Sequence, residues 1–312
     1  MLAFQLALEL IILILVGIFV QKTGMVDKKF DESLTSFLLN IALPCVIIKS
    51  LRVEFSPEEL LNCAIMIALA LLVCLVLGVV GQVFYLVTGK TDSGRILRFG
   101  AMFTNFTFVG MPVIETLFGN QGLFYFVVFT VPLRMLYYSA AKPMLSPPGQ
   151  QREKTSLLRH IKSWMCPPVV AVFIGLFLYI TQLQLPGVVN DVINSVGSIC
   201  SPLGMILCGI SLGKYNIKAL ARPQYMLMPM VRNVLSPAIF LGIMMLLPVD
   251  PLIAKVVVVY TALPCASLLA AFTIQYNPDP RARMEAAGGV LLSTLLSAVT
   301  IPLWAAVAER LL

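Results

Sequence analysis

Two apolar segments combine a proline with small or polar residues in a pattern that predicts a binding site for an anion. The first contains Asn105, Gly110 and Pro112, and the second contains Ala262 and Pro264. A proline inside a helix removes a backbone hydrogen bond, and hydrocarbon offers nothing to replace it. Paired interruptions of this kind can point helix N-termini at a site near the middle of the membrane, where backbone amides bind an anionic group. The alternative interpretation is two ordinary kinks, each filled by neighbouring side chains.

A second pair of segments repeats the combination. One contains Asn40 and Pro44, and the other contains Ser201 followed by Pro202. We expect these residues to line the same site from the side. For Asn40, an interhelical hydrogen bond worth about 0.6 kcal/mol is an equally good interpretation.

Basic residues inside apolar segments are further candidates. Arg232, followed by Asn233, could hold a carboxylate through two parallel hydrogen bonds. The alternative is that the Arg232 side chain extends to the membrane surface. Arg134 and Lys255 are predicted to be residues of the membrane–water interface, with side chains that extend to the membrane surface.

Acidic residues inside apolar segments are few, and burying their charge is costly. Glu115 and Glu9 are therefore the candidates for accepting a proton that is coupled to movement of a solute. The alternatives are a Glu115 carboxylate that reaches the aqueous interface and a Glu9 that serves packing or a dimer contact.

Other chemistries are not supported by the sequence. The seven cysteines form no CxxC pair and no cluster with histidine, so we expect neither a metal site nor a disulfide framework. The H-E-x-x-H and G-x-S-x-G motifs of hydrolases are absent, which argues against an enzyme and against a cofactor. The net charge of +7 is spread over short loops, so nucleic acid is not expected as a partner.

The elements that must position these residues are membrane helices. The chain has 312 residues, of which 59% are hydrophobic and 12% charged, and its mean hydropathy is +0.93. Soluble domains carry about 25% charged residues, so the lipid bilayer is the expected surroundings. The N-terminal segment lacks a basic start and a cleavage site, and we interpret it as the first span rather than as a signal peptide.

Apolar runs predict ten transmembrane helices in an all-α integral membrane fold. They cover residues 4–20, 33–51, 61–88, 96–118, 123–140, 167–181, 192–212, 225–247, 252–275 and 286–308. Residues 1–141 form a first group of five, residues 142–166 a basic linker, and residues 167–312 a second group of five.

Charge in the loops predicts the orientation. Loops after odd-numbered spans hold most of the lysines and arginines, whereas the opposite side holds only Lys49, Arg52 and Arg310. Because basic loops stay in the cytoplasm, both termini are predicted outside and the linker inside. Five spans per half also mean that related halves would be inverted relative to each other, as in many secondary transporters.

Taken together, these segments resemble the auxin efflux carrier family in its compact prokaryotic form. The residues that carry the resemblance are Asn40…Pro44, Asn105…Gly110-Met-Pro112…Phe118-Gly119, Arg232…Pro237, Ala262-Leu-Pro264 and Ser293-Thr294-Leu-Leu-Ser297…Pro302.

The resemblance implies a fold like that of the bile acid/sodium symporters, with two inverted five-helix repeats and with helices 4 and 9 broken and crossing. It implies a scaffold domain, through which a homodimer could form, and a transport domain. The implied activity is alternating-access transport of a small organic anion such as malonate, malate or an auxin-like acid across the plasma membrane, the inner membrane in a bacterium. In that case Asn105, Pro112 and Pro264 form the carboxylate site, with Asn40 and Pro44 nearby.

The acidic cluster that binds sodium in the symporter relatives has no match, so proton coupling is preferred to sodium coupling. An anion channel and a sensor derived from a transporter remain the alternatives.

Overall fold

The computed structural model describes the backbone of residues 2–27, 29–52, 56–147, 167–214 and 225–312, and within these not the side chains of residues 2–11, 138, 211 and 212. In the described residues the regular structure is helical, with one isolated antiparallel bridge between Thr104 and Cys265. The predicted all-helical class is confirmed for these residues. Most of the basic linker predicted at 142–166 lies outside them.

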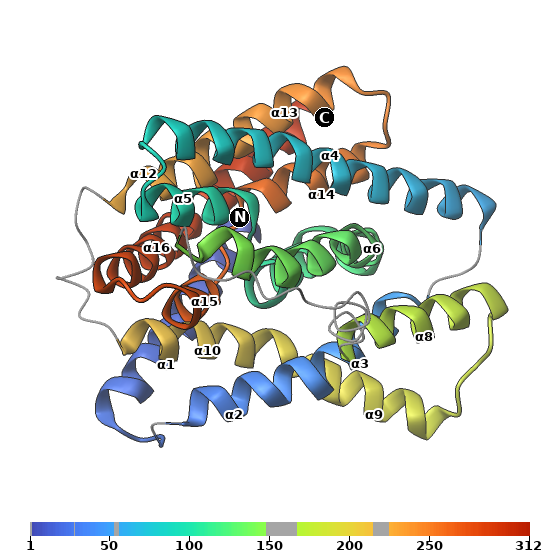
Figure 1. Cartoon of the computed structure of the whole chain (residues 1–312). Coiled ribbons are helices and arrows are strands. Elements are labelled where there is room, and N and C mark those ends of the chain that lie inside the picture. Colours follow the sequence, from blue (N-terminus) through green and yellow to red (C-terminus); the bar gives the residue numbers. More distant parts are fainter. Residues whose placement is uncertain (1, 28, 53–55, 148–166, 215–224) are drawn as a thin grey trace.

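A first helix group packs around α1 and α10. Its members are α1 (Leu2–Thr23), α2 (Phe30–Phe37), η1 (Leu38–Ala42), α3 (Leu43–Ser50), α8 (Pro167–Thr181), α9 (Gly187–Ser198) and α10 (Cys200–Gly213), where η denotes a π-helical turn. In this group α1 packs along α10, and α3 packs against both α8 and α9. These helices occupy the lower part of Figure 1.

A second helix group packs around α4, α6, α14 and α16 and occupies the upper part of Figure 1. Its members are α4 (Pro57–Val87), α5 (Asp92–Met102), η2 (Phe106–Gly110), α6 (Met111–Leu145), α12 (Leu227–Met230), η4 (Val231–Leu235), α13 (Ser236–Leu246), α14 (Pro251–Ala262), α15 (Leu269–Tyr276) and α16 (Pro280–Leu311). The two groups meet where α10 contacts η2, where α3 contacts α6 and where α1 contacts α16.

The helices have the length and composition of membrane spans. Within the described residues, six are long and apolar enough to cross a bilayer, and three shorter apolar helices accompany them. Helix α4 exposes Leu71, Leu75, Val79 and Val83, which are four residues apart and so share one face. Such a face suits contact with lipid, and the structure agrees with an integral membrane protein. The count of ten spans stays a prediction.

The predicted breaks in the fourth and ninth spans are present, but the first lies elsewhere than expected. The run 96–118 is interrupted at residues 103–105 and not at Pro112, which takes the second position of α6. The helix therefore starts after the break, at Phe106, and runs through the π-turn η2 into α6, so Pro112 lies within it. In the ninth span α14 ends at Ala262, since the residue before Pro264 is disfavoured in α-helical conformation.

All three π-turns precede a proline by a few residues. η1, η2 and η4 lie immediately before the helices that begin with Leu43-Pro44, Met111-Pro112 and Ser236-Pro237. Proline at position i leaves the carbonyl of residue i−4 without its helical donor. For Pro237 that carbonyl belongs to Asn233, and the Trp304 indole donates to it over 2.9 Å. The bundle thus replaces the bond that the proline removes.

Contact between α1 and α10 depends on two glycines. A Cβ atom on Gly17 would lie 2.1 Å from the Ile206 carbonyl oxygen, and one on Gly209 would lie 2.0 Å from the Ile14 carbonyl oxygen. Small residues let membrane helices approach backbone to backbone in this way. The contact is therefore specified by these two residues.

We predict that Gly209→Ala destabilises the protein by about 1–3 kcal/mol, as overpacking does. Thermal unfolding in detergent would show a lower Tm. The matched control is Gly242→Ala in α13, where an added Cβ meets no atom within 4 Å. Equal Tm values for the two variants would contradict the prediction.

Candidate functional site

The two interrupted segments meet and hydrogen-bond to each other. The Asn105 amide donates to the Pro264 carbonyl oxygen over 2.8 Å, and the Ala266 amide donates to the Phe103 carbonyl oxygen over 3.1 Å. These bonds form the bridge between Thr104 and Cys265. We call residues 103–105 and 263–268 the crossover. Each break thus supplies hydrogen-bond partners for the other.

Arg232 lies where the two helices end at the crossover. Its side chain is fully buried, and Nη1 donates to the Ala101 carbonyl oxygen in the last turn of α5 over 2.9 Å. Nη2 and Nε donate over 3.1 Å to the carbonyl oxygens of Tyr260 and Leu263, at the end of α14. The guanidinium joins the C-terminal ends of both helices. The side chain is buried and does not extend to the membrane surface, so that alternative is wrong. The predicted role in holding a carboxylate stays a prediction.

Asn233 and Ser293 hold the crossover from the other side. The Ser293 hydroxyl donates to Asn233 Oδ1 over 2.7 Å and accepts from the Cys265 amide over 3.0 Å. Asn233 Nδ2 lies 3.4 Å from the Ala262 carbonyl oxygen. All of these groups are buried. Asn233 and Ala262 are therefore part of the framework that fixes the crossover.

Asn105 caps the helix that follows it. Its Oδ1 accepts from the Phe108 amide over 3.2 Å, which satisfies one of the first amides of η2. Its Nδ2 contacts Cys208 Sγ of α10 at 3.4 Å. The side chain thus links the crossover in the second helix group to α10 in the first.

A cavity of about 20 Å³ lies at the N-terminal ends of η2 and α15. The residues that line it are Leu39, Thr104, Asn105, Phe106, Thr107, Phe108, Tyr137, Ala266, Ser267 and Leu268. The first amides of a helix lack partners within the helix, and its N-terminus carries partial positive charge. Two such termini at one cavity favour an anion, as the sequence predicts for this place.

Arg134 contacts two residues that line this cavity, a position that the sequence did not predict. Its side chain is buried, Nη1 donates to Thr107 Oγ1 over 3.2 Å, and the guanidinium carbon lies 4.7 Å from the centre of the Phe106 ring. The prediction that Arg134 is an interface residue is wrong. Its position two residues after Pro132, inside an apolar run, was the available signal.

The other predicted residues have different places. Pro112 and Gly110 are buried below the crossover, and a Cβ on Gly110 would lie 2.7 Å from Leu263 Cδ1. Ser201 lies in the first turn of α10, half-buried. None of the three lines the cavity.

Asn40 and Pro44 are not brought to the crossover cavity. Asn40 is exposed and its Nδ2 donates to Ser36 Oγ over 3.0 Å, within the same helix. Pro44 is half-buried at the start of α3. Their neighbour Leu39 is the residue of this segment that reaches the cavity.

The two coupling candidates are also outside it. Glu115 pairs with Lys49 at 3.3 Å, which joins α6 to α3 across the two helix groups. The Glu9 side chain lies outside the described residues.

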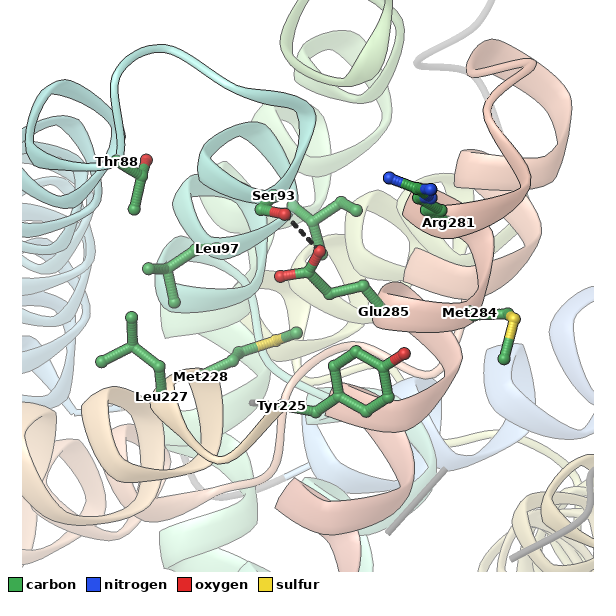
Figure 2. A pocket seen from close by; sticks show the side chains of 10 residues that line it. Thr88, Ser93, Leu97, Tyr225, Leu227, Met228, Arg281, Met284 and Glu285 are labelled. Carbon is green, nitrogen blue, oxygen red and sulfur yellow. Dashed lines mark hydrogen bonds between the residues drawn. The ribbon is translucent and has the colours of Figure 1, made fainter. Parts of the chain in front are cut away.

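A larger cavity, of about 580 Å³, opens between the first turns of α5 and α16 and the start of α12 (Figure 2). The Ser93 hydroxyl is hydrogen-bonded to the Glu285 carboxylate there, and Arg281 lies on the same helix as Glu285. Met228 forms the inner wall, and its side chain covers Gly100 near the end of α5. Arg281 and Glu285 carry opposite charges in this cavity, whereas no carboxylate lines the crossover cavity, so we place the candidate anion site at the crossover.

Comparison with known proteins gives the family. Residues 2–305 match the sequence profile of the membrane transport protein family. The chain belongs to this family. It includes the auxin efflux carriers, so the resemblance seen in the sequence is confirmed at the level of the family, and the chain is a multi-pass membrane protein.

Two archaeal proteins are similar to the chain along nearly their whole length. An uncharacterized transporter of Methanothermobacter thermautotrophicus is 24% identical over 306 residues, covering 96% of each chain. An uncharacterized transporter of Methanocaldococcus jannaschii is 24% identical over 319 residues, covering 97% of this chain and 98% of its own.

We predict that Ser293→Ala lowers the stability of the folded protein by about 1–3 kcal/mol, because it leaves the buried Cys265 amide without its hydroxyl acceptor. The measurement is Tm in detergent. Ser297→Ala is the matched control, since Ser297 is buried on the same helix and its hydroxyl serves only the Thr294 carbonyl of that helix. A drop in Tm as large for Ser297→Ala would contradict the prediction.

Proposed function

We propose that the protein is a secondary transporter of a small organic anion and that the crossover cavity binds the carboxylate of its substrate. The observation that carries the proposal is the meeting of two helix N-termini at one cavity, beside the amide of Asn105 and the buried guanidinium of Arg134. Backbone amides at helix N-termini recognise carboxylates, and a guanidinium adds a charge-assisted hydrogen bond.

Alternating access is the mechanism that this geometry supports best. A cavity of about 20 Å³ has room for one water molecule, so a carboxylate enters only after the walls separate. Leu39 of the first helix group forms one wall, and crossover residues of the second group form the others. Movement of the second group, as the transport domain, against the first, as the scaffold, would open the cavity to each side in turn.

This proposal extends to the fold of the whole chain. In it, the two halves are inverted five-helix repeats arranged as in the bile acid/sodium symporters, with ten spans and both termini outside the plasma membrane. The scaffold group offers the surface for a homodimer. Malonate, malate and auxin-like acids are the substrates to test first.

The energy source is proposed to be a proton or the membrane potential. An anion leaving a cell gains about 2.3 kcal/mol per charge at an inside-negative potential of about 100 mV. The ion pair between Lys49 and Glu115 joins the two helix groups and would have to break as they move. A proton on Glu115 would release it, which keeps Glu115 as a coupling candidate along with Glu9.

The test is ligand-induced stabilisation of the purified protein, followed by uptake into proteoliposomes. We expect one of a panel of mono- and dicarboxylates to raise Tm saturably in the wild type. Asn105→Ala should lose this shift and the uptake, because the cap that orders the η2 amides is gone.

Asn194→Ala, an exposed residue of α9, is the control and should keep both. If the folded Asn105→Ala variant binds and transports the anion as well as the wild type does, the crossover is excluded as the anion site.

Arg134 provides a separate prediction. Arg134→Gln keeps a donor but removes the charge, so substrate affinity should fall about 10- to 100-fold, the loss expected for one hydrogen bond to a charged group. Arg134→Lys should lose less. Dissociation constants from the same Tm titrations measure this, and equal affinities of the Gln and Lys variants would rule out a role for the charge.

A further inference from the structure

The carbonyl oxygens around Arg232 form a site of the kind that elsewhere holds a free cation. In carriers with interrupted helices, half-helix C-termini and unwound carbonyls coordinate a coupling ion. Here the carbonyl oxygens of Ala101, Tyr260 and Leu263 lie 2.9, 3.1 and 3.1 Å from guanidinium nitrogens. They belong to the ends of α5 and α14, where both helix dipoles attract positive charge.

The charge of Arg232 is balanced by these dipoles and not by an acid. Among the described residues, no carboxylate oxygen lies within 4.0 Å of its guanidinium, although the side chain is fully buried. The face of the Tyr260 ring also contacts it, with the ring centre 5.7 Å from the guanidinium carbon. A buried charge without a charged partner is normally very unfavourable. The arrangement is stable here because backbone carbonyls and a ring face solvate the cation.

We propose that Arg232 is a tethered cation, which permanently occupies the position between the two half-helix C-termini where a free coupling cation would otherwise bind. Its charge is carried with the crossover in every state, so the site needs no ion from solution. The consequence for transport, independence from Na⁺, rests on the proposed function. The cation site itself can be tested without any transport.

The direct test is to empty the site. Arg232→Ala removes the guanidinium and leaves the carbonyl oxygens around a space of its size. We expect a lower Tm, and we expect guanidinium chloride at non-denaturing concentration to restore most of the loss in the variant while leaving wild-type Tm unchanged or lower. Choline chloride at the same ionic strength should restore nothing.

A matched control separates a cation site from a general effect of salt. Lys255→Ala also removes a cation of the second helix group, but one paired with the Glu309 carboxylate at 2.9 Å and not with carbonyls. Its Tm should not respond to guanidinium. A response of both variants, or of neither, would overturn the proposal.

A second comparison applies if Arg232→Ala does not fold. Arg232→Lys keeps the charge, whereas Arg232→Met fills a similar volume without it. Replacing a buried ion pair by apolar side chains is often neutral or stabilising, so a site without a preference for a cation should tolerate Met. The tethered cation requires a higher Tm for the Lys variant, and an equal or higher Tm for the Met variant would refute it.

Transport then distinguishes the two proposals. If a carboxylate is taken up by proteoliposomes, replacing Na⁺ by choline should leave wild-type uptake unchanged, and a requirement for Na⁺ would contradict the tethered cation. If no anion is taken up, the carrier proposal fails, while the Tm comparisons still decide the role of Arg232.

Discussion

The need to satisfy every backbone hydrogen bond away from water governs this structure. Hydrocarbon supplies neither donors nor acceptors, so a helix that ends inside a membrane must find partners within the protein. The α5 and α14 helices end in the buried interior of the described bundle, and their unpaired groups are satisfied by each other and by Arg232. The neighbouring Asn233 and Ser293 complete the set. Several of the buried polar side chains near the crossover thus serve the backbone.

The crossover also separates charge. C-terminal carbonyls of two helices converge on Arg232, whereas the N-terminal ends of η2 and α15 converge on the cavity beside Asn105. The partial charges at these ends have opposite sign, and they are fixed by the backbone and therefore independent of pH. One side of the crossover is consequently occupied by the Arg232 guanidinium, while on the other side the helix N-termini face the cavity. The two sides of the crossover therefore carry partial charges of opposite sign.

The all-helical class and the apolar character of the helices could be predicted from the sequence, because long apolar runs directly reflect the membrane. The number of spans and their orientation stay predictions. The sequence also predicted two helix interruptions, from Asn105, Pro112 and Pro264. The position of the first break was not predicted, since the helix accommodates Pro112 with the π-turn η2 and starts six residues earlier, after Asn105. The contacts of Arg232 could not be predicted either. Its partners are backbone carbonyls, which every residue type has, so no residue type in the sequence indicates them. Asn40 shows the converse, because spacing from a proline does not tell which face of a helix carries the side chain.

The π-turn η1 makes the helix Phe30–Ser50 compliant beside the cavity. Pro44 has no amide hydrogen, so the regular ladder is already missing one bond at this point. Leu39 lies in the same turn and forms part of the cavity wall. A bend centred there can widen or narrow the wall while the bonds on either side stay intact. The first helix group therefore has an irregular turn in the helix Phe30–Ser50 at the point where it contributes Leu39 to the crossover cavity.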